Sequence, residues 1–193
     1  MAHHEGGQTG TGNAPGGDEP RVIDDATVAS TASVAGGVFL SRSATVEDQA
    51  RVVGAVEVTD HGSIGGTSLV EGSIRIDGHG RVGGAAQVTG HDIHIGDQAV
   101  VDGNAVVTGH GIVIKDRARV GDDHRVGSGA QLLHADHVYS WDGGHDGRWT
   151  VFRTANGHSA GIRDGSDQTV ADLEHSDRAP HALKAHVKAH TWG

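Results

Sequence analysis

The fold is decided by residues 52–76, which read VVGAVEVTDHGSIGGTSLVEGSIRI. Every sixth residue of this stretch is a branched aliphatic: Val52, Val58, Ile64, Val70 and Ile76. Self-similarity at a fixed period is the sequence signature of a repeat architecture. The same spacing continues in both directions along the chain.

The period of six runs from Val22 to Val138 with two interruptions. It holds without a miss from Val22 to Val88, and one extra residue then shifts its phase to Ile95. A second extra residue shifts it to Ile114. The further aliphatic positions are Val28, Val34, Leu40, Val46, Val82, Val101, Val107, Val120, Val126 and Leu132.

Two further columns accompany the aliphatic one. Four residues after an aliphatic the side chain is small, as in Ala44, Ala50 and Ala86. Two residues after it stands mostly Gly or Asp, as in Asp48 and Gly66, and these residue types tolerate bends and positive φ. Branched aliphatics favour short strands. The three columns predict a strand, a bend and the next strand, with three such hexapeptide faces in a coil of about 18 residues.

One corner of the predicted coil is distinctive because it is glycine in five successive coils. These glycines are Gly36, Gly54, Gly72, Gly90 and Gly109. Both extra residues fall at this corner, in Thr89–Asp92 and Thr108–Gly111. We expect each to form a small bulge that restores the stacking.

The sequence thus predicts an all-β chain, a single-stranded parallel β-helix with a small C-terminal cap. Residues 1–20 are Gly-rich and polar and are predicted to be a disordered tail, 21–140 form the β-helix, and 141–193 form the cap.

Within the predicted cap, Trp149–Thr154 alternates like a strand and is followed by the turn Ala155-Asn156-Gly157 and a returning strand from His158 to Arg163. Thr169–Glu174 begins with a Thr-x-x-Asp pattern, which predicts a helical turn. Pro180 suits the first turn of a helix that extends to about His190. The cap is expected to cover the open last coil.

Composition excludes several classes of function. A formal net charge of −10 argues against a nucleic-acid partner bound through its phosphates. The absence of cysteine excludes disulfides and thiolate chemistry. No apolar run reaches membrane-spanning length, and the N-terminus lacks the apolar core of a secretion signal. We expect a cytoplasmic protein, or part of a phage or other assembly, with no membrane partner.

The repeat resembles the hexapeptide-repeat superfamily of left-handed β-helices, and residues 95–100 and 120–123 match its pattern closely. A weaker resemblance is to bactofilin-like polymer-forming β-helices. The C-terminal arrangement also resembles bacterial and phage proteins described as acetyltransferase-like. The resemblance implies a left-handed coil and a homo-oligomer, with a trimer favoured. Many members of the superfamily are acyltransferases that bind acyl-CoA between neighbouring prisms and use a histidine as general base.

Four histidines are candidates for that role. His91 and His110 are predicted to stack at the bulged corner, and His61 and His79 on another. For all four the simpler interpretation is a solvent-facing corner residue, because the fourth position of the hexapeptide is unconstrained. The coils also lack the long projecting loop that accompanies the superfamily's catalytic histidine, which counts against catalysis.

Metal sites find less support in the sequence. No His pair within residues 22–140 has the five-residue spacing of the zinc-binding γ-class carbonic anhydrases. His91 with His94, and His134 with His137, are three apart and are expected on different faces. His186 and His190 lie one helical turn apart but lack a nearby acidic general base, so a solvated face explains them better. No calcium-binding nonapeptide repeat is present.

We therefore expect a non-catalytic β-helical scaffold or assembly module with no cofactor. The alternative is a hexapeptide-type acyltransferase that uses acetyl-CoA, with His91 or His110 as base. A second alternative is a filament-forming or phage-associated structural protein.

Overall fold

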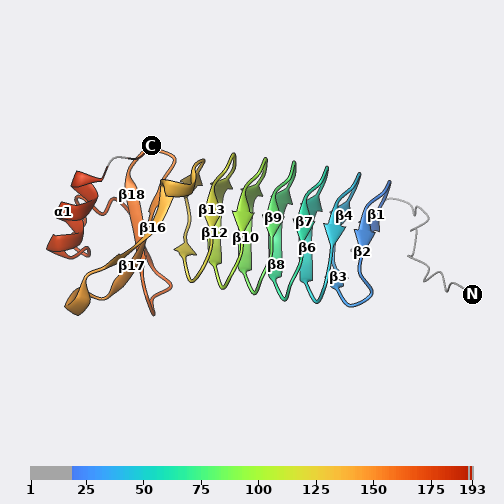
Figure 1. The fold of residues 1–193 in the computed structure, drawn as a ribbon, viewed down its shortest axis with the longest axis horizontal. Coiled ribbons are helices and arrows are strands. Elements are labelled where there is room, and N and C mark those ends of the chain that lie inside the picture. The colour runs from blue at the N-terminus through green and yellow to red at the C-terminus, as the bar shows by residue number, and fades with distance from the viewer. Residues whose placement is uncertain (1–18, 191, 193) are drawn as a thin grey trace, which may run out of the picture.

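In the computed structural model, which describes residues 19–190 and 192, the chain is a row of stacked parallel β-coils followed by an antiparallel sheet and one helix (Figure 1). The coils run from the N-terminal side of the described chain towards the cap at the other end of the molecule. The predicted single-stranded parallel β-helix with a hairpin and helix cap is confirmed. Nearly all of the predicted tail, residues 1–20, lies outside the described residues.

The coils form two parallel sheets. The larger sheet contains β1 (Arg21–Val22), β3 (Ser33–Ala35), β4 (Phe39–Leu40), β6 (Arg51–Val58), β8 (Leu69–Ile76), β10 (Gln87–Ile95), β12 (Val106–Ile114), β14 (Arg125–Val126) and β15 (Gln131–Leu132). The smaller contains β2 (Thr27–Val28), β5 (Thr45–Val46), β7 (Ser63–Ile64), β9 (Arg81–Val82), β11 (Val100–Val101) and β13 (Arg119–Val120).

Strand register places the aliphatic residues in three vertical ladders. In the first ladder Val22 lies opposite Leu40, which in turn lies opposite Val58 on the following coil. In the second and third ladders, Val28 lies opposite Val46 and Val34 lies opposite Val52. From the second coil up to Leu132 the aliphatic members of these ladders are fully buried, with exposures of 0%. The core is therefore a narrow column in which each coil packs on its two neighbours.

The bends between faces use the left-handed backbone conformation that the Gly and Asp column predicted. Asp48, Asp60 and Asp97 have φ of 56°, 60° and 57°, and Gly66 and Gly84 have similar values. Asp tolerates this region better than most residues because its short polar side chain bonds locally. From the second coil on, the alanines four positions after the aliphatics, such as Ala44, Ala50 and Ala86, are buried inside the corners.

The glycine corner is the tightest. A Cβ on Gly72 would lie 1.9 Å from the carbonyl oxygen of Gly90, and one on Gly90 would lie 1.9 Å from that of Gly109. The predicted bulges are present at this corner, because the register between β8 and β10 shifts between His91 and Ile93. The inserted residues Asp92 and Gly111 both have positive φ, of 54° and 61°.

The cap is a four-stranded antiparallel sheet in the order β16 (Val138–Asp142), β17 (Arg148–Arg153), β18 (Ser159–Arg163) and β19 (Thr169–Val170). Two short 3₁₀ helices, η1 (Ala135–His137) and η2 (Gly144–Asp146), flank β16. The helix α1 (His181–Ala189) follows Pro180 as predicted.

Each face of the cap sheet packs against a different part of the molecule. Phe152, Ala160 and Ile162 join the core of the coils, so one face closes the last coil. Trp149 and Val151 belong to a second core on the opposite face, together with Leu183 and Val187 of α1. This arrangement follows from the alternation of side chains along a strand.

The prediction of a helical turn over Thr169–Glu174 is wrong for its first residues. Thr169 and Val170 form β19 and pair with Ile162 and Gly161 of β18. The pairing buries Val170, which the Thr-x-x-Asp pattern does not take into account. Among the described residues, no helix is long and apolar enough to cross a membrane.

Candidate functional sites

His91 and His110 lie side by side at the bulged corner, as predicted, because they are register partners in β10 and β12. Both side chains are exposed. Nδ1 of His110 lies 3.1 Å from Oγ of Ser128, and that oxygen also accepts a hydrogen bond from the His110 backbone N–H. Neither histidine lines the two cavities described below.

His61 and His79 also stack on adjacent coils. Their ring centroids are 4.8 Å apart with an interplanar angle of 7°. This contact follows from the constant length of the coil, which places equivalent corner residues directly above one another. Repetition of the coil alone therefore accounts for the pairing.

The expectation that His134 and His137 point to different faces is wrong. The helix η1 interrupts the coil here and brings their rings to 5.0 Å in an edge-to-face contact. His137 is fully buried, and its Nδ1 accepts a hydrogen bond from the backbone N–H of Leu133. In the other His pair with this spacing, His91 and His94, the side chain of His94 forms a hydrogen bond with Asp77 on the neighbouring coil.

A cluster of aromatic and imidazole rings joins α1 to β16. The ring of Tyr139 packs against the rings of His190 and His186, with centroid distances of 4.5 Å and 5.6 Å. The ring centroids of His190 and Trp192 are 4.7 Å apart. Burial raises the pKa of Tyr139 to about 12. In the described part of the chain, no group of three or more His, Asp or Glu residues is arranged to hold a metal ion.

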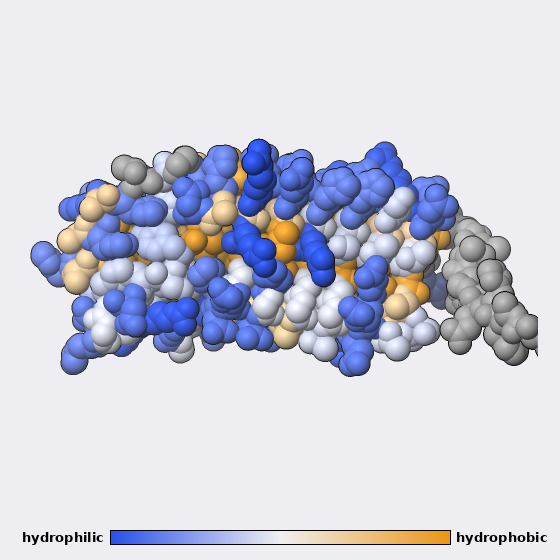
Figure 2. Space-filling view, viewed as in Figure 1, coloured by the Kyte–Doolittle hydropathy of each residue, from blue (hydrophilic) through white to orange (hydrophobic). Residues whose placement is uncertain are grey.

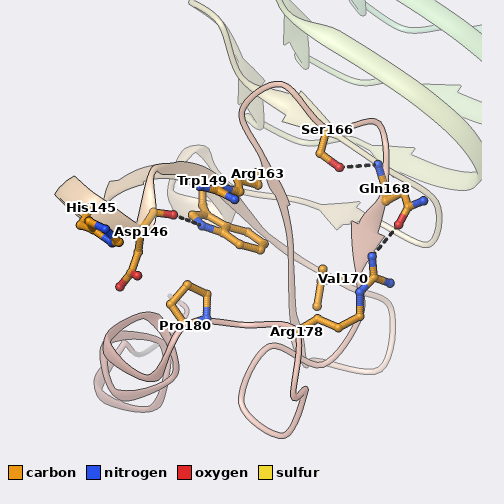
Figure 3. A pocket seen from close by; sticks show the side chains of 9 residues that line it. All are labelled: His145, Asp146, Trp149, Arg163, Ser166, Gln168, Val170, Arg178 and Pro180. Carbon is orange, nitrogen blue, oxygen red and sulfur yellow. Dashed lines mark hydrogen bonds between the residues drawn. The ribbon is translucent and has the colours of Figure 1, made fainter.

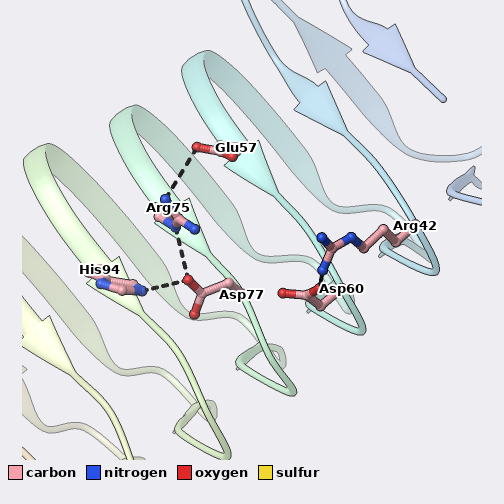
Figure 4. Close-up of polar contacts among 6 residues, drawn as sticks. All are labelled: Arg42, Glu57, Asp60, Arg75, Asp77 and His94. Carbon is pink, nitrogen blue, oxygen red and sulfur yellow. Dashed lines mark hydrogen bonds and ion pairs between the residues drawn. The ribbon is translucent and has the colours of Figure 1, made fainter. Parts of the chain in front are cut away.

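The sides of the β-helix carry polar ladders that run from coil to coil (Figure 4). Arg75 lies between Glu57, at 4.0 Å, and Asp77, at 2.9 Å, and Nε2 of His94 lies 2.9 Å from the same Asp77 carboxylate. Burial alone would raise the pKa of Asp77, but the hydrogen bonds from His94 and Arg75 outweigh it and lower that pKa. Figure 2 shows polar and charged residues over most of the visible side, with apolar residues between and beneath them.

A cavity of about 420 Å³ lies in the cap, outside the face that closes the coils (Figure 3). It is lined by His145, Asp146, Trp149, Arg163, Ser166, Gln168, Val170, Arg178 and Pro180. A second hollow of about 750 Å³ on the side of the last coils is lined by Asp97, Gln98, Asp116, Arg117, His134 and Ala135.

In the part of the chain that the structure describes, no element covers the first coil, whereas the cap covers the last. Among these residues, each of β1, β2 and β3 pairs only with a strand of the second coil, at β4, β5 and β6. Ile23 and Val28 are each 36% exposed, whereas Val46, the ladder neighbour of Val28, is fully buried. Among the described residues these two are the only large hydrophobic side chains that are exposed.

Sequence reasoning missed both the cap cavity and the open end as candidate sites. The cavity residues come from three separate segments, 145–149, 163–170 and 178–180, with no shared spacing, so no sequence signal finds them. The open end had a signal, because residues 1–20 contain no Val, Ile, Leu or Phe to continue the ladders. Comparison of the chain with protein-family models, with curated proteins and with solved structures finds no match.

Proposed function

We propose that this chain is a non-catalytic β-helical scaffold that assembles with a second copy through its open first coil. The observation that carries the proposal is the contrast between the two ends of one solenoid. The last coil is covered by the cap, and the first coil leaves strand edges and aliphatic side chains exposed.

The identity of the partner follows from the shape of this end. Edge strands with free N–H and C=O groups are a template for pairing with another chain. Another copy offers the same three edges at the same spacing, and its own Val22, Val28 and Val34 would continue the three apolar ladders. Because the other end is capped, stacking stops at two copies and gives a dimer instead of an open filament.

The sides of the β-helix support this choice over the trimer that the family resemblance favours. A trimer packed through the face that carries Glu57, Arg75, Asp77 and His94 would cover this polar ladder, and burying such charges is costly. Among residues 19–190 and 192, the exposed large hydrophobic side chains, Ile23 and Val28, are instead confined to the first coil.

The oligomeric mass of the purified protein tests the proposal. Light scattering after size-exclusion chromatography should give the mass of two copies for the wild type and of one copy for Val28→Lys and for Ile23→Lys. Gln87→Lys, which places the same charge on an exposed side position of β10, should remain a dimer. Circular dichroism establishes that each variant is folded. A monomeric wild type, a trimer, or a dimer that survives both first-coil substitutions would reject the proposed interface.

The acyltransferase alternative is tested separately. It requires His91 or His110 as general base and acetyl-CoA as donor. The scaffold proposal expects no heat of binding when acetyl-CoA is titrated into the protein. Micromolar binding of acetyl-CoA would overturn the scaffold proposal. Loss of acetyl transfer in His91→Ala or His110→Ala would then identify the general base, and intact turnover would exclude that residue.

A further inference from the structure

The cavity in the cap is a second candidate site of the molecule. It lies between η2, the strands β17 to β19 and the segment that leads into α1. Its volume of about 420 Å³ is within the range of small-molecule sites in proteins, roughly 300–1,000 Å³. The cavity is at the opposite end from the proposed dimer contact, so the inference below does not depend on that proposal.

Trp149 forms the apolar wall of the cavity. Its side chain is almost wholly buried, and its Nε1–H donates a hydrogen bond of 3.3 Å to the backbone oxygen of Asp146. Val170 and Pro180 complete this apolar part of the lining. A fixed indole beside small aliphatic groups suits a flat or ring-shaped ligand.

Two arginines supply the charge of the cavity. Arg178 donates a hydrogen bond of 2.6 Å to Oε1 of Gln168, and the backbone N–H of Gln168 bonds to Oγ of Ser166. Arg163 lies over Gly147, where a Cβ would be 3.0 Å from its Nε. Neither guanidinium has a carboxylate partner within the described part of the chain.

The balance of charge in the lining favours an anion. Asp146 is the single carboxylate that lines the cavity, against the two guanidinium groups of Arg163 and Arg178. The whole chain carries a formal net charge of −10, so this cationic cavity stands apart from the average surface.

We propose that the cap cavity binds a small ring compound that carries a carboxylate or phosphate group. Guanidinium groups bind both oxyanions through paired, charge-assisted hydrogen bonds. The ring of the ligand packs against Trp149, Val170 and Pro180, and the oxyanion faces Arg163 and Arg178. Sugar acids and sugar phosphates are the two sources of this chemistry.

Nuclear magnetic resonance distinguishes the two sources. Glucuronate, glucose 6-phosphate and glucose are each titrated to millimolar concentration into ¹⁵N-labelled protein, and the indole N–H signal of Trp149 is followed. We expect a saturable shift with glucuronate, glucose 6-phosphate or both, and none with glucose. A response to only one of the two anions identifies the source.

Substitution of the arginines completes the test. The double variant Arg163→Gln/Arg178→Gln should bind about tenfold more weakly or worse, because a lost charge-assisted hydrogen bond of roughly 1.5 kcal/mol changes affinity by that factor. Arg81→Gln, an exposed arginine of β9 on the side of the β-helix, is the matched control and should bind like the wild type. No shift with either anion, an equal response to glucose, or unchanged affinity in the double variant would overturn the proposal.

Discussion

Replacing Gly72 with alanine should destabilise the β-helix far more than the same replacement at Gly111, although both residues lie at the glycine corner. At Gly72 φ is +123°, and the added Cβ would lie 1.9 Å from the carbonyl oxygen of Gly90 on the next coil. At Gly111 φ is +61°, and nothing lies within 4 Å of the added Cβ.

The magnitudes follow from these two geometries. A φ of +123° is outside the small left-handed basin, which costs a residue with a Cβ about 1–3 kcal/mol. The clash is with backbone, so the coils must separate locally and weaken one or two hydrogen bonds of about 1 kcal/mol each. Gly72→Ala should therefore lose about 3–5 kcal/mol, and Gly111→Ala only about 1–2 kcal/mol. Asp92, the register neighbour of Gly111, already occupies the same conformation with a φ of 54°.

Urea denaturation followed by circular dichroism measures both losses, and thermal melting gives a second reading. For a chain of this size each kcal/mol lowers Tm by about 2–4 °C, so Gly72→Ala should melt about 6–20 °C below the wild type. Equal losses for the two variants would refute the reasoning, because they would mean that close approach between coils does not set the need for glycine.

Two further predictions concern the polar and aromatic contacts. Asp77→Asn should cost at most about 1 kcal/mol at pH 7, because Arg75 is half exposed. Since the lowered pKa of Asp77 makes its ionised form the stabilising one, the difference from wild type should begin to shrink as pH falls below about 4, the usual pKa of an Asp side chain, and should be lost once pH is below the lowered pKa. A difference that is the same in urea titrations at pH 7 and at pH 2.5 would contradict the ion-pair assignment. Tyr139→Phe should leave Tm unchanged or raise it, because the buried hydroxyl has no hydrogen-bond partner among the described residues. A fall in Tm of several degrees would contradict this prediction and show that the hydroxyl stabilises the fold.

The β-helix was predictable from sequence because each residue type in it has one local role. Val58, Ile64 and Val70 repeat at a fixed spacing, and the Asp or Gly two positions later sets the bend, so spacing alone determines register. The bulges at Asp92 and Gly111 were equally visible as shifts of phase.

The cap was predicted only in part because its contacts are between segments without a repeat. The hairpin of β17 and β18 and the helix α1 have local signals, and these predictions were confirmed. The strands β16 and β19 exist through pairing with β17 and β18, which no local pattern in Val138–Asp142 or Thr169–Val170 specifies. The repeat predicted the stacked histidines, because equivalent positions of successive coils lie above one another. The cavity around Trp149 was not predictable, because its lining residues come together only in the folded cap.

The constant length of the coil determines how such a protein can become longer or shorter. Removing residues 59–76 would join Val58 to Asp77 and leave every remaining aliphatic on its own wall. The first coil and the C-terminal cap would be unchanged, while the β-helix would become shorter by one strand spacing, about 4.8 Å. Whole-coil duplications or deletions thus act as a molecular ruler, in which the distance between the two tips varies in fixed increments independently of what either tip binds.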